Sequence, residues 1–178
     1  MADFTDPRQN IARLQLKDGM HVADFGCGSG FYSMAAAHRV GSRGRVTAID
    51  VQKELLEKLL EQARREHLTN IDVVWGNLDE MGGSKLADES EDAAIVSNVL
   101  FQSESKDVLA SECARILKPG GSVLIIDWSD SFDHLGPPPE QVLTEETAKS
   151  YFMTAGFEFK ERFDAGEHHY GLIFKKPV

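Results

Sequence analysis

The sequence feature that most constrains the fold of this chain is a glycine-rich turn that follows a short apolar run. Residues 22–25 read Val-Ala-Asp-Phe, glycines stand at positions 26, 28 and 30, and a helix is predicted over residues 31–38. A buried strand, a glycine turn and a helix in this order bring backbone N–H groups close to a ligand, because glycine has no Cβ to hold the ligand away. The turn therefore predicts a ligand site at the end of the first strand of an α/β fold.

The spacing of the glycines and the acid before them indicate what kind of ligand this is. A dinucleotide fingerprint needs its third glycine at position 31, where this chain has Phe31. Asp24 stands just before the turn. A carboxylate repels a diphosphate and attracts an ammonium or a sulfonium group. We therefore expect a ligand that is cationic where it faces Asp24.

Length and charge narrow the class of protein. The chain has 178 residues, which is enough for one domain with a sizeable core, and its formal net charge is -10. The negative average potential opposes non-specific binding to nucleic acid or to anionic membranes. Residues 1–6 carry no secretory leader, and no apolar run approaches the ~18 residues of a membrane span. We expect a cytoplasmic protein that neither inserts into a membrane nor binds nucleic acid.

The two cysteines also indicate a reducing, cytoplasmic compartment. Cys27 lies in the glycine turn and Cys113 on the apolar face of a predicted helix, so a disulfide between them is not expected. Neither cysteine has the spacing of a metal ligand. We expect no metal.

The apolar pattern along the chain alternates between strands and helices. Strands are predicted at residues 21–25, 45–50, 71–75, 91–98 and 122–127, and helices at residues 7–16, 31–38, 53–67, 108–117 and 144–155. Residues 157–163 and 170–174 then alternate in the manner of a hairpin, with the turn at residues 164–167. The pattern predicts a Rossmann-like, doubly wound α/β sheet with helices on both faces and an antiparallel last strand.

Polar residues and glycines are predicted to meet at one edge of this sheet. Ligands bind beyond the carboxyl ends of parallel strands, where this chain has Asp24, Asp50, Asn77, Ser97 and Asp127. Asp50 ends the second strand 20 residues after Gly30, a position that suits a carboxylate bonded to a ribose diol. A nucleoside on one side and a cation on the other describe S-adenosylmethionine better than NAD.

Five segments of the chain resemble those of a known protein family. The chain is similar to the class I S-adenosylmethionine-dependent methyltransferases, of the small-molecule type that includes the ubiquinone and menaquinone biosynthesis C-methyltransferases. The matching segments are residues 22–30, 46–51, 76–78, 94–100 and 115–121. The resemblance implies strand order 3-2-1-4-5-7-6 with strand 7 antiparallel, and one methyltransferase domain over residues 1–178 without a separate substrate-cap domain.

The resemblance also implies where the cofactor lies. Asp24 and the turn would surround its methionine end, Asp50 would hold the ribose, and Val51 would pack on the adenine. Asn77 stands where the family more often has Asp, so its side-chain oxygen would be a weaker acceptor for the adenine amine. The residues implied for cofactor binding are Asp24, Gly26, Cys27, Gly28, Gly30, Asp50, Val51, Asn77, Leu78 and Ser97.

Methyl transfer does not require a catalytic side chain that a sequence would reveal. Alignment of the reactants supplies up to ~7–11 kcal/mol, and a general base is needed only for a poor nucleophile. The candidates at the active edge are Asn98, Asp127 and His168. Adjacent strand residues face opposite sides, so at most one of His168 and His169 is expected to face the pocket. His134 is a further candidate, in the loop after the fifth strand.

Several acceptors are argued against by the residues present. Amino-methyltransferases of nucleic acid place two prolines and an aromatic residue where residues 97–100 read Ser-Asn-Val-Leu, and cytosine chemistry needs a suitably placed thiolate. Arsenic methylation would need several cysteines. The expected acceptor is a small molecule, with a protein side chain as the alternative.

Two other functions and one assembly state stay open. A non-catalytic sensor or scaffold that binds S-adenosylmethionine is the main rival, and a nicotinamide oxidoreductase is a weaker one. The chain also lacks the N-terminal helices or inserted subdomain with which many relatives cover the acceptor. We therefore expect an open acceptor site or one completed by a second subunit, and predict a homodimer.

Overall fold

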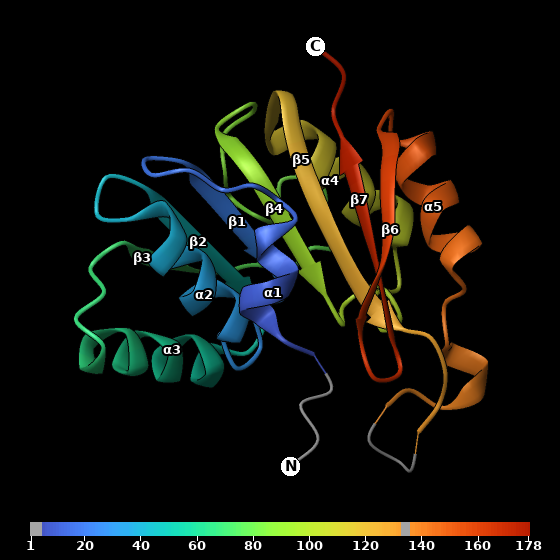
Figure 1. Cartoon of the computed structure of the whole chain (residues 1–178), viewed down its shortest axis with the longest axis horizontal. Coiled ribbons are helices and arrows are strands. Elements are labelled where there is room, and N and C mark those ends of the chain that lie inside the picture. The colour runs from blue at the N-terminus through green and yellow to red at the C-terminus, as the bar shows by residue number, and fades with distance from the viewer. Residues whose placement is uncertain (1–4, 133–135) are drawn as a thin grey trace.

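The computed structural model of the chain describes residues 5–132 and 136–178. Its centre is a seven-stranded sheet with the order β3-β2-β1-β4-β5-β7-β6 (Figure 1). β1 to β5 run parallel, and β7 runs antiparallel to both β5 and β6. The strands are β1 His21–Phe25, β2 Arg45–Asp50, β3 Ile71–Trp75, β4 Glu91–Ser97, β5 Leu117–Trp128, β6 Glu158–Gly166 and β7 His169–Lys175. The predicted strand order and the antiparallel last strand are confirmed.

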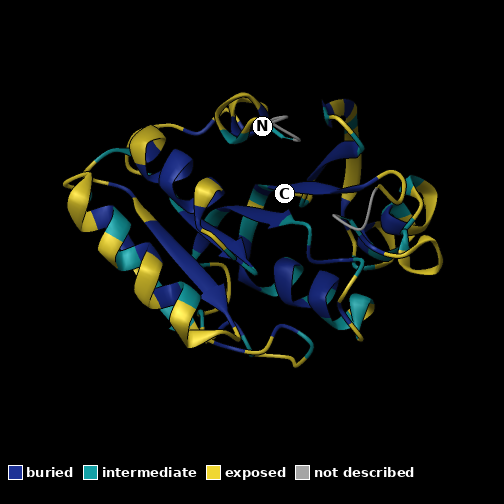
Figure 2. Ribbon diagram, turned by 90° about the horizontal axis from the view of Figure 1, so that it is seen from below, coloured by how far each residue is buried: buried dark blue, intermediate teal, exposed yellow. Residues whose placement is uncertain are grey.

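Helices cover both faces of the sheet, as predicted. They are α1 Pro7–Ala12, α2 Phe31–Val40, α3 Lys53–Arg65, α4 Lys106–Ile116 and α5 Glu145–Thr154, with a short 3-10 helix, η1, at Pro139–Gln141. In α3 the buried side chains Leu56, Leu59 and Ala63 recur at helical spacing, and the opposite side of the helix is exposed (Figure 2). None of the helices within residues 5–132 and 136–178 is long and apolar enough to cross a membrane.

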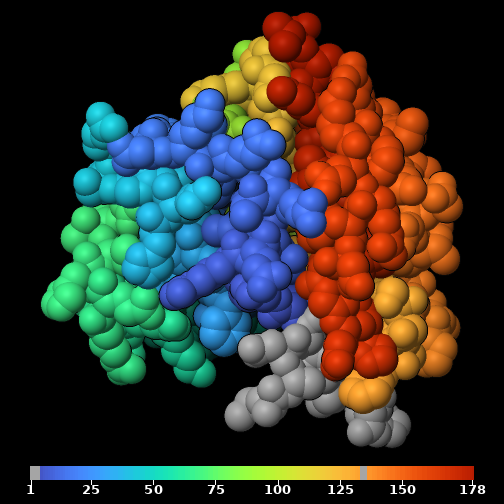
Figure 3. Space-filling view, viewed as in Figure 1, coloured from blue at the N-terminus to red at the C-terminus, as the bar shows by residue number. Residues whose placement is uncertain are grey.

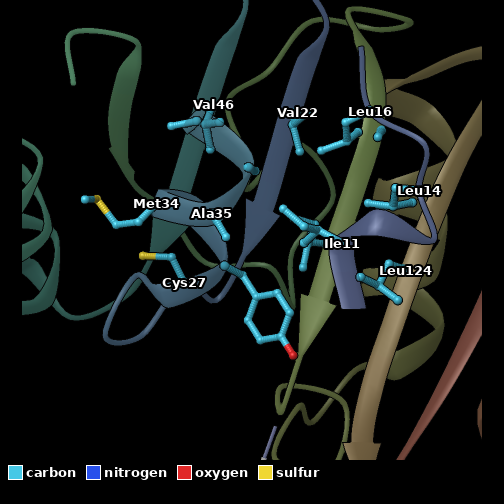
Figure 4. Close-up of a cluster of buried hydrophobic side chains, with 14 of the residues drawn as sticks. Ile11, Leu14, Leu16, Val22, Cys27, Met34, Ala35, Val46 and Leu124 are labelled. Atoms are coloured by element: carbon cyan, nitrogen blue, oxygen red, sulfur yellow. The ribbon is translucent and has the colours of Figure 1, made fainter. Parts of the chain in front are cut away.

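The core consists of two apolar clusters, one on each face of the sheet. Side chains of a strand alternate between the faces, so Val22 belongs to one cluster while Ala23 and Phe25 belong to the other. The first cluster packs α1, α2 and α3 against the sheet, and Ile11 and Leu14 contribute from the N-terminal segment (Figure 4). The second cluster packs α4 and α5 against the opposite face. Burial on both faces explains why the strands read as nearly continuous apolar runs.

Four predicted boundaries were wrong. α1 ends at Ala12 rather than at residue 16, and Gln15 takes the left-handed conformation that stops a helix, with φ of +51°. β5 begins at Leu117 rather than at residue 122, because Leu117 pairs with Glu91 and the register then shifts. The hairpin turn is shorter than predicted, since β6 continues to Gly166 and β7 starts at His169.

Candidate functional site

A cavity of about 640 Å³ lies at the carboxyl ends of β1 to β4, the edge where the sequence predicts a ligand. All ten residues implied for cofactor binding line it, namely Asp24, Gly26, Cys27, Gly28, Gly30, Asp50, Val51, Asn77, Leu78 and Ser97. The parallel strands bring these residues together from four separate parts of the chain. Their individual contacts with a cofactor stay predictions.

The glycine turn is held in its shape by backbone bonds and close packing. The N–H groups of Gly26 and Cys27 donate to the carbonyl oxygen of Ile49, at 2.8 and 3.0 Å. Gly26 has a φ of +69°, and a Cβ there would lie 2.4 Å from a methyl group of Val99. Gly28 has a φ of +52° and open space around it. The turn thus requires glycine at position 26 for packing and leaves room beside Gly28.

Asp50 binds the glycine turn from the end of β2. Its Oδ2 accepts a hydrogen bond of 3.0 Å from the Gly28 N–H, and its Oδ1 accepts one of 2.9 Å from the Gln52 N–H. A carboxylate offers about four lone-pair positions, so both oxygens can still accept a hydrogen bond from a hydroxyl group. This is the chemistry that a ribose diol needs.

Asp24 is a buried acid in the wall of the cavity. Its carboxylate is 1% exposed and accepts a hydrogen bond of 2.5 Å from the Ser33 hydroxyl on α2. Burial raises the pKa of Asp24 to about 6, the Ser33 hydrogen bond opposes this, and the nearby Asp50 charge adds to it. A cation placed beside Asp24 would favour its charged form.

The charges that line the cavity have one sign. Asp24, Asp50 and Asp79 are carboxylates, and no Lys or Arg occurs among the described lining residues. The wall is therefore suited to a cation or a neutral donor and unfavourable for a phosphate.

Asn77 already uses its amide within its own loop. Its Oδ1 accepts a hydrogen bond of 3.1 Å from the Asp79 N–H, and its Nδ2 donates to Glu80 at 3.0 Å. Only one lone pair of Oδ1 therefore stays open for an adenine amine. Beside it Val51 is 57% exposed, and the Trp75 indole donates a hydrogen bond of 3.0 Å to the Val51 carbonyl.

The loop that carries Asn77 is anchored by Glu112, a residue that the sequence analysis did not single out. The Glu112 side chain is fully buried and accepts hydrogen bonds from the Gly82 N–H at 2.9 Å and the Ser84 hydroxyl at 2.5 Å. Burial alone would raise its pKa, but hydrogen bonds from Arg115 and Ser84 outweigh this and lower the pKa to about 2. The available signal was an acid among the apolar positions of a predicted helix, three residues after Leu109.

The N-terminal segment closes one side of the cavity, which the sequence analysis also missed. Thr5, Pro7 and Tyr32 line the cavity, and the Asn10 side chain donates to the Tyr32 hydroxyl at 3.0 Å. Asn10 also donates to the carbonyl of Ala165 at 3.0 Å, so the N-terminal segment connects the cavity wall to the β6–β7 hairpin. The segment and the hairpin pack against each other (Figure 3).

The three catalytic candidates lie in three different places. Asn98 lines the cavity. Asp127 is fully buried outside it, and accepts hydrogen bonds from the backbone N–H groups of Phe101 at 3.1 Å and Trp128 at 2.8 Å. Burial raises the pKa of Asp127 to about 7, although these hydrogen bonds oppose it. Asp127 therefore holds the loop after β4 in place.

Both histidines line a second cavity of about 600 Å³, and neither is among the described residues that line the cavity beside the glycine turn. His168 lies in the turn before β7, with a φ of +61°. The rule that adjacent side chains of a strand face opposite sides therefore does not apply to it. Its Nδ1 lies 2.6 Å from an Asp130 oxygen. His169 is 3% exposed, and its burial lowers its pKa. His134 lies outside the described residues.

Comparison with known proteins agrees with this geometry. The family model for a methyltransferase domain matches residues 16–169. The crystal structure of an S-adenosylmethionine-dependent methyltransferase from Aquifex aeolicus superposes with a TM-score of 0.86 and 28% identity, covering 97% of this chain and 90% of that one.

Two curated relatives match shorter stretches. An arsenite methyltransferase of Halobacterium salinarum is 33% identical over 109 residues, which are 61% of this chain and 27% of that protein. A demethylmenaquinone methyltransferase of Listeria welshimeri is 27% identical over 122 residues, which are 68% of this chain and 50% of that protein. The chain thus spans half or less of the length of these relatives.

Proposed function

Because the chain belongs to the class I S-adenosylmethionine-dependent methyltransferases, we propose that its cavity binds S-adenosylmethionine and that the protein transfers the methyl group to a small-molecule acceptor. The observation that carries the proposal is the charge of the cavity. Three carboxylates line it without a Lys or Arg among the described lining residues, beside a turn of three glycines with positive φ. A sulfonium and an ammonium group suit this wall, and the diphosphate of a nicotinamide dinucleotide does not.

The proposed cofactor lies across three neighbouring strands. The adenine would lie at the end of β3 beside Asn77 and Leu78, the ribose at the end of β2 on Asp50, and the methionine end at β1 beside Asp24. Because β3, β2 and β1 are consecutive in the sheet, one extended molecule can reach all three positions. β4 is the next strand, so we place the acceptor side of the cavity beyond the methionine end, at Asn98.

When bound, S-adenosylmethionine would supply a methyl carbon for in-line attack by an acceptor lone pair, with S-adenosylhomocysteine as the leaving group. The contribution of this chain is alignment, which supplies up to ~7–11 kcal/mol for well-oriented reactants. Asp24 and the backbone of the glycine turn would hold the methionine end, and Asp50 would fix the ribose. No metal ligand set is found among the described residues, and none is part of the proposal.

A small molecule is the proposed acceptor, and arsenite is not favoured. Cys27 lines the cavity, but Cys113 is fully buried in the apolar cluster on the other face of the sheet. Burial raises the pKa of both thiols above the ordinary value, which keeps them neutral. The two cysteines therefore cannot bind one arsenic atom together. Neither arsenite nor demethylmenaquinone is proposed as the specific acceptor of this chain.

Two measurements test the proposed function. Calorimetric titration should show binding of S-adenosylhomocysteine, whereas tight binding of NADH in its place would overturn the assignment. Incubation with S-adenosyl-L-methionine labelled on the methyl group should then move the label to a member of a panel of small amines, alcohols, phenols, quinols and arsenite. Label recovered in protein would favour a protein side-chain methyltransferase. Cofactor binding with no transfer, in the presence of candidate partners, would favour a sensor or scaffold.

The assembly state is proposed separately. We propose a homodimer in which a second subunit helps to cover the acceptor side. Light scattering coupled to size-exclusion chromatography, with S-adenosylhomocysteine present, should give twice the monomer mass of 19.7 kDa. Elution as a monomer would contradict the dimer without affecting the cofactor assignment.

A further inference from the structure

Asn98 has an unusual backbone conformation at the end of β4. Its φ is +56°, in the left-handed region that residues with a Cβ rarely adopt. Asn tolerates this region better than most residues, but a strained position of this kind persists only where the surrounding structure fixes it, and such positions cluster at ligand sites. Here the backbone is fixed on both sides, because the Asn98 N–H donates to Ile126 at 2.8 Å and its carbonyl accepts from the Gln102 side chain at 2.9 Å.

The side chain of Asn98 lacks the partner that its backbone has. Its Oδ1 is buried and has no hydrogen-bond partner among the residues that the structure describes. A buried carbonyl oxygen is normally paired, and an unpaired one at a ligand site indicates a donor that is absent. Asn98 lines the cavity, so a bound ligand is the natural source of that donor.

The position of Asn98 along the sheet indicates which ligand supplies the donor. Under the proposed function, β3, β2 and β1 carry the adenine, ribose and methionine ends, and Asn98 follows β4, the next strand. Gly26 of the turn and Val99 are in close approach, since a Cβ on Gly26 would lie 2.4 Å from Val99. Asn98 therefore precedes the residue that packs on the glycine turn, where the proposed function puts the methionine end of the cofactor. Asp24, an acid, is the better partner for the cofactor's own ammonium group.

We propose that Asn98 Oδ1 accepts a hydrogen bond from the nucleophilic group of the methyl acceptor, and that this group is an amine nitrogen or a hydroxyl oxygen that carries a hydrogen. The inference rests on the proposed function and adds to it the class of acceptor. The hydrogen bond orients the group so that its lone pair faces the methyl carbon. The lone pair forms the new bond to carbon, the carbon–sulfur bond breaks with its electrons passing to sulfur, and the acceptor's proton leaves to water.

The test uses a probe that carries such a donor at the transfer position. Sinefungin resembles S-adenosylmethionine but has an amine where the sulfonium carries its methyl group, whereas S-adenosylhomocysteine has nothing there. Asn98→Gly removes the amide and suits the positive φ, so the fold is not strained. Calorimetry should show an S-adenosylhomocysteine Kd within about twofold of wild type and a sinefungin Kd about tenfold weaker. Asn98→Asp, which keeps the acceptor oxygen and adds charge, should restore or strengthen sinefungin binding.

The control is a second amide at the other end of the cavity. Asn77→Ala should weaken both compounds by the same factor, because they share the adenine. If Asn98→Gly weakens both compounds equally, or weakens neither, Asn98 does not face the transfer position and the inference is wrong. Failure of the wild-type protein to bind S-adenosylhomocysteine would instead overturn the proposed function itself.

Discussion

Asp50 and Gly28 are joined by a hydrogen bond of 3.0 Å between residues that are 22 positions apart in the sequence. The bond ties the end of β2 to the glycine turn after β1, so the acid proposed to hold the ribose also fixes the backbone beside it. Both functions depend on the parallel pairing of β1 with β2, which sets Phe25 opposite Ile49.

Removing the Asp50 carboxylate tests the proposed ribose contact. Asp50→Ala should weaken S-adenosylhomocysteine binding by about 1.5–3 kcal/mol, the range for hydrogen bonds to a charged group. The matched control is Asp72→Ala on β3, because Asp72 is exposed and pairs with Arg45 rather than lining the cavity. Calorimetry on both variants, with circular dichroism to show that they fold, makes the comparison. An unchanged Kd for a folded Asp50→Ala protein would contradict the site assignment.

The pKa of Asp24 predicts a pH dependence of cofactor affinity. Burial raises this pKa to about 6 in the free protein, and a bound cation would lower it, so binding releases a proton below pH 6. S-adenosylmethionine affinity should therefore increase as pH rises from 5.5 to about 6 and then level off by pH 7. Asp24→Asn should bind more weakly and show a flat profile over the same range. A wild-type affinity that falls with rising pH would show that Asp24 does not face a cation.

Asp127 predicts a pH dependence of stability with a definite sign. Burial raises its folded-state pKa from 3.8 to about 7, so between these values the folded protein holds a proton that the unfolded chain has lost. The free energy of unfolding should fall as pH rises through this window, by at most about 1.4 kcal/mol per pH unit from this group. Urea unfolding at pH 5.5, 6.5 and 7.5 should show a shallower fall for Asp127→Asn than for wild type. Parallel profiles for the two proteins would refute the assignment.

Alanine substitutions at two glycines of the turn distinguish the cost of overpacking from the cost of a strained backbone. Gly26→Ala places a methyl group against Val99, at 2.4 Å, and also strains a φ of +69°. It should lower the free energy of unfolding by about 2–4 kcal/mol, the sum of overpacking and left-handed strain.

Gly28→Ala is the comparison, because its φ is also positive but no atom lies within 4 Å of the added methyl group. It should cost only about 1–2 kcal/mol. Equal losses of stability in urea titrations of the two variants would show that contact with Val99 does not matter.

Much of the lining of the candidate site could be predicted from the sequence because its signals are local. The end of a strand is visible in the sequence as the end of an apolar run. Parallel pairing then brings the carboxyl ends of these strands to one edge of the sheet. This is why Asp24, Asp50 and Asn77, which belong to three separate motifs, were expected together and line one cavity. The predicted start of β5 failed because it depends on pairing between distant segments. β5 starts early because Leu117 meets Glu91, which the local glycines and proline do not reveal.

The sequence by itself determined the fold and the edge of the sheet at which the candidate site lies, because glycine spacing, strand ends and apolar periodicity are properties of short segments, and the family followed from the resemblance of those segments. Only the tertiary structure decided how the individual side chains are used. It placed Asp127 under a loop, both histidines at a second cavity, and Asn98 at the cavity beside the glycine turn, with a side-chain oxygen that has no hydrogen-bond partner among the described residues. The physical reason is that burial, hydrogen-bond pairing and a residue's φ are set by neighbours far away in the chain, which a segment read alone does not contain.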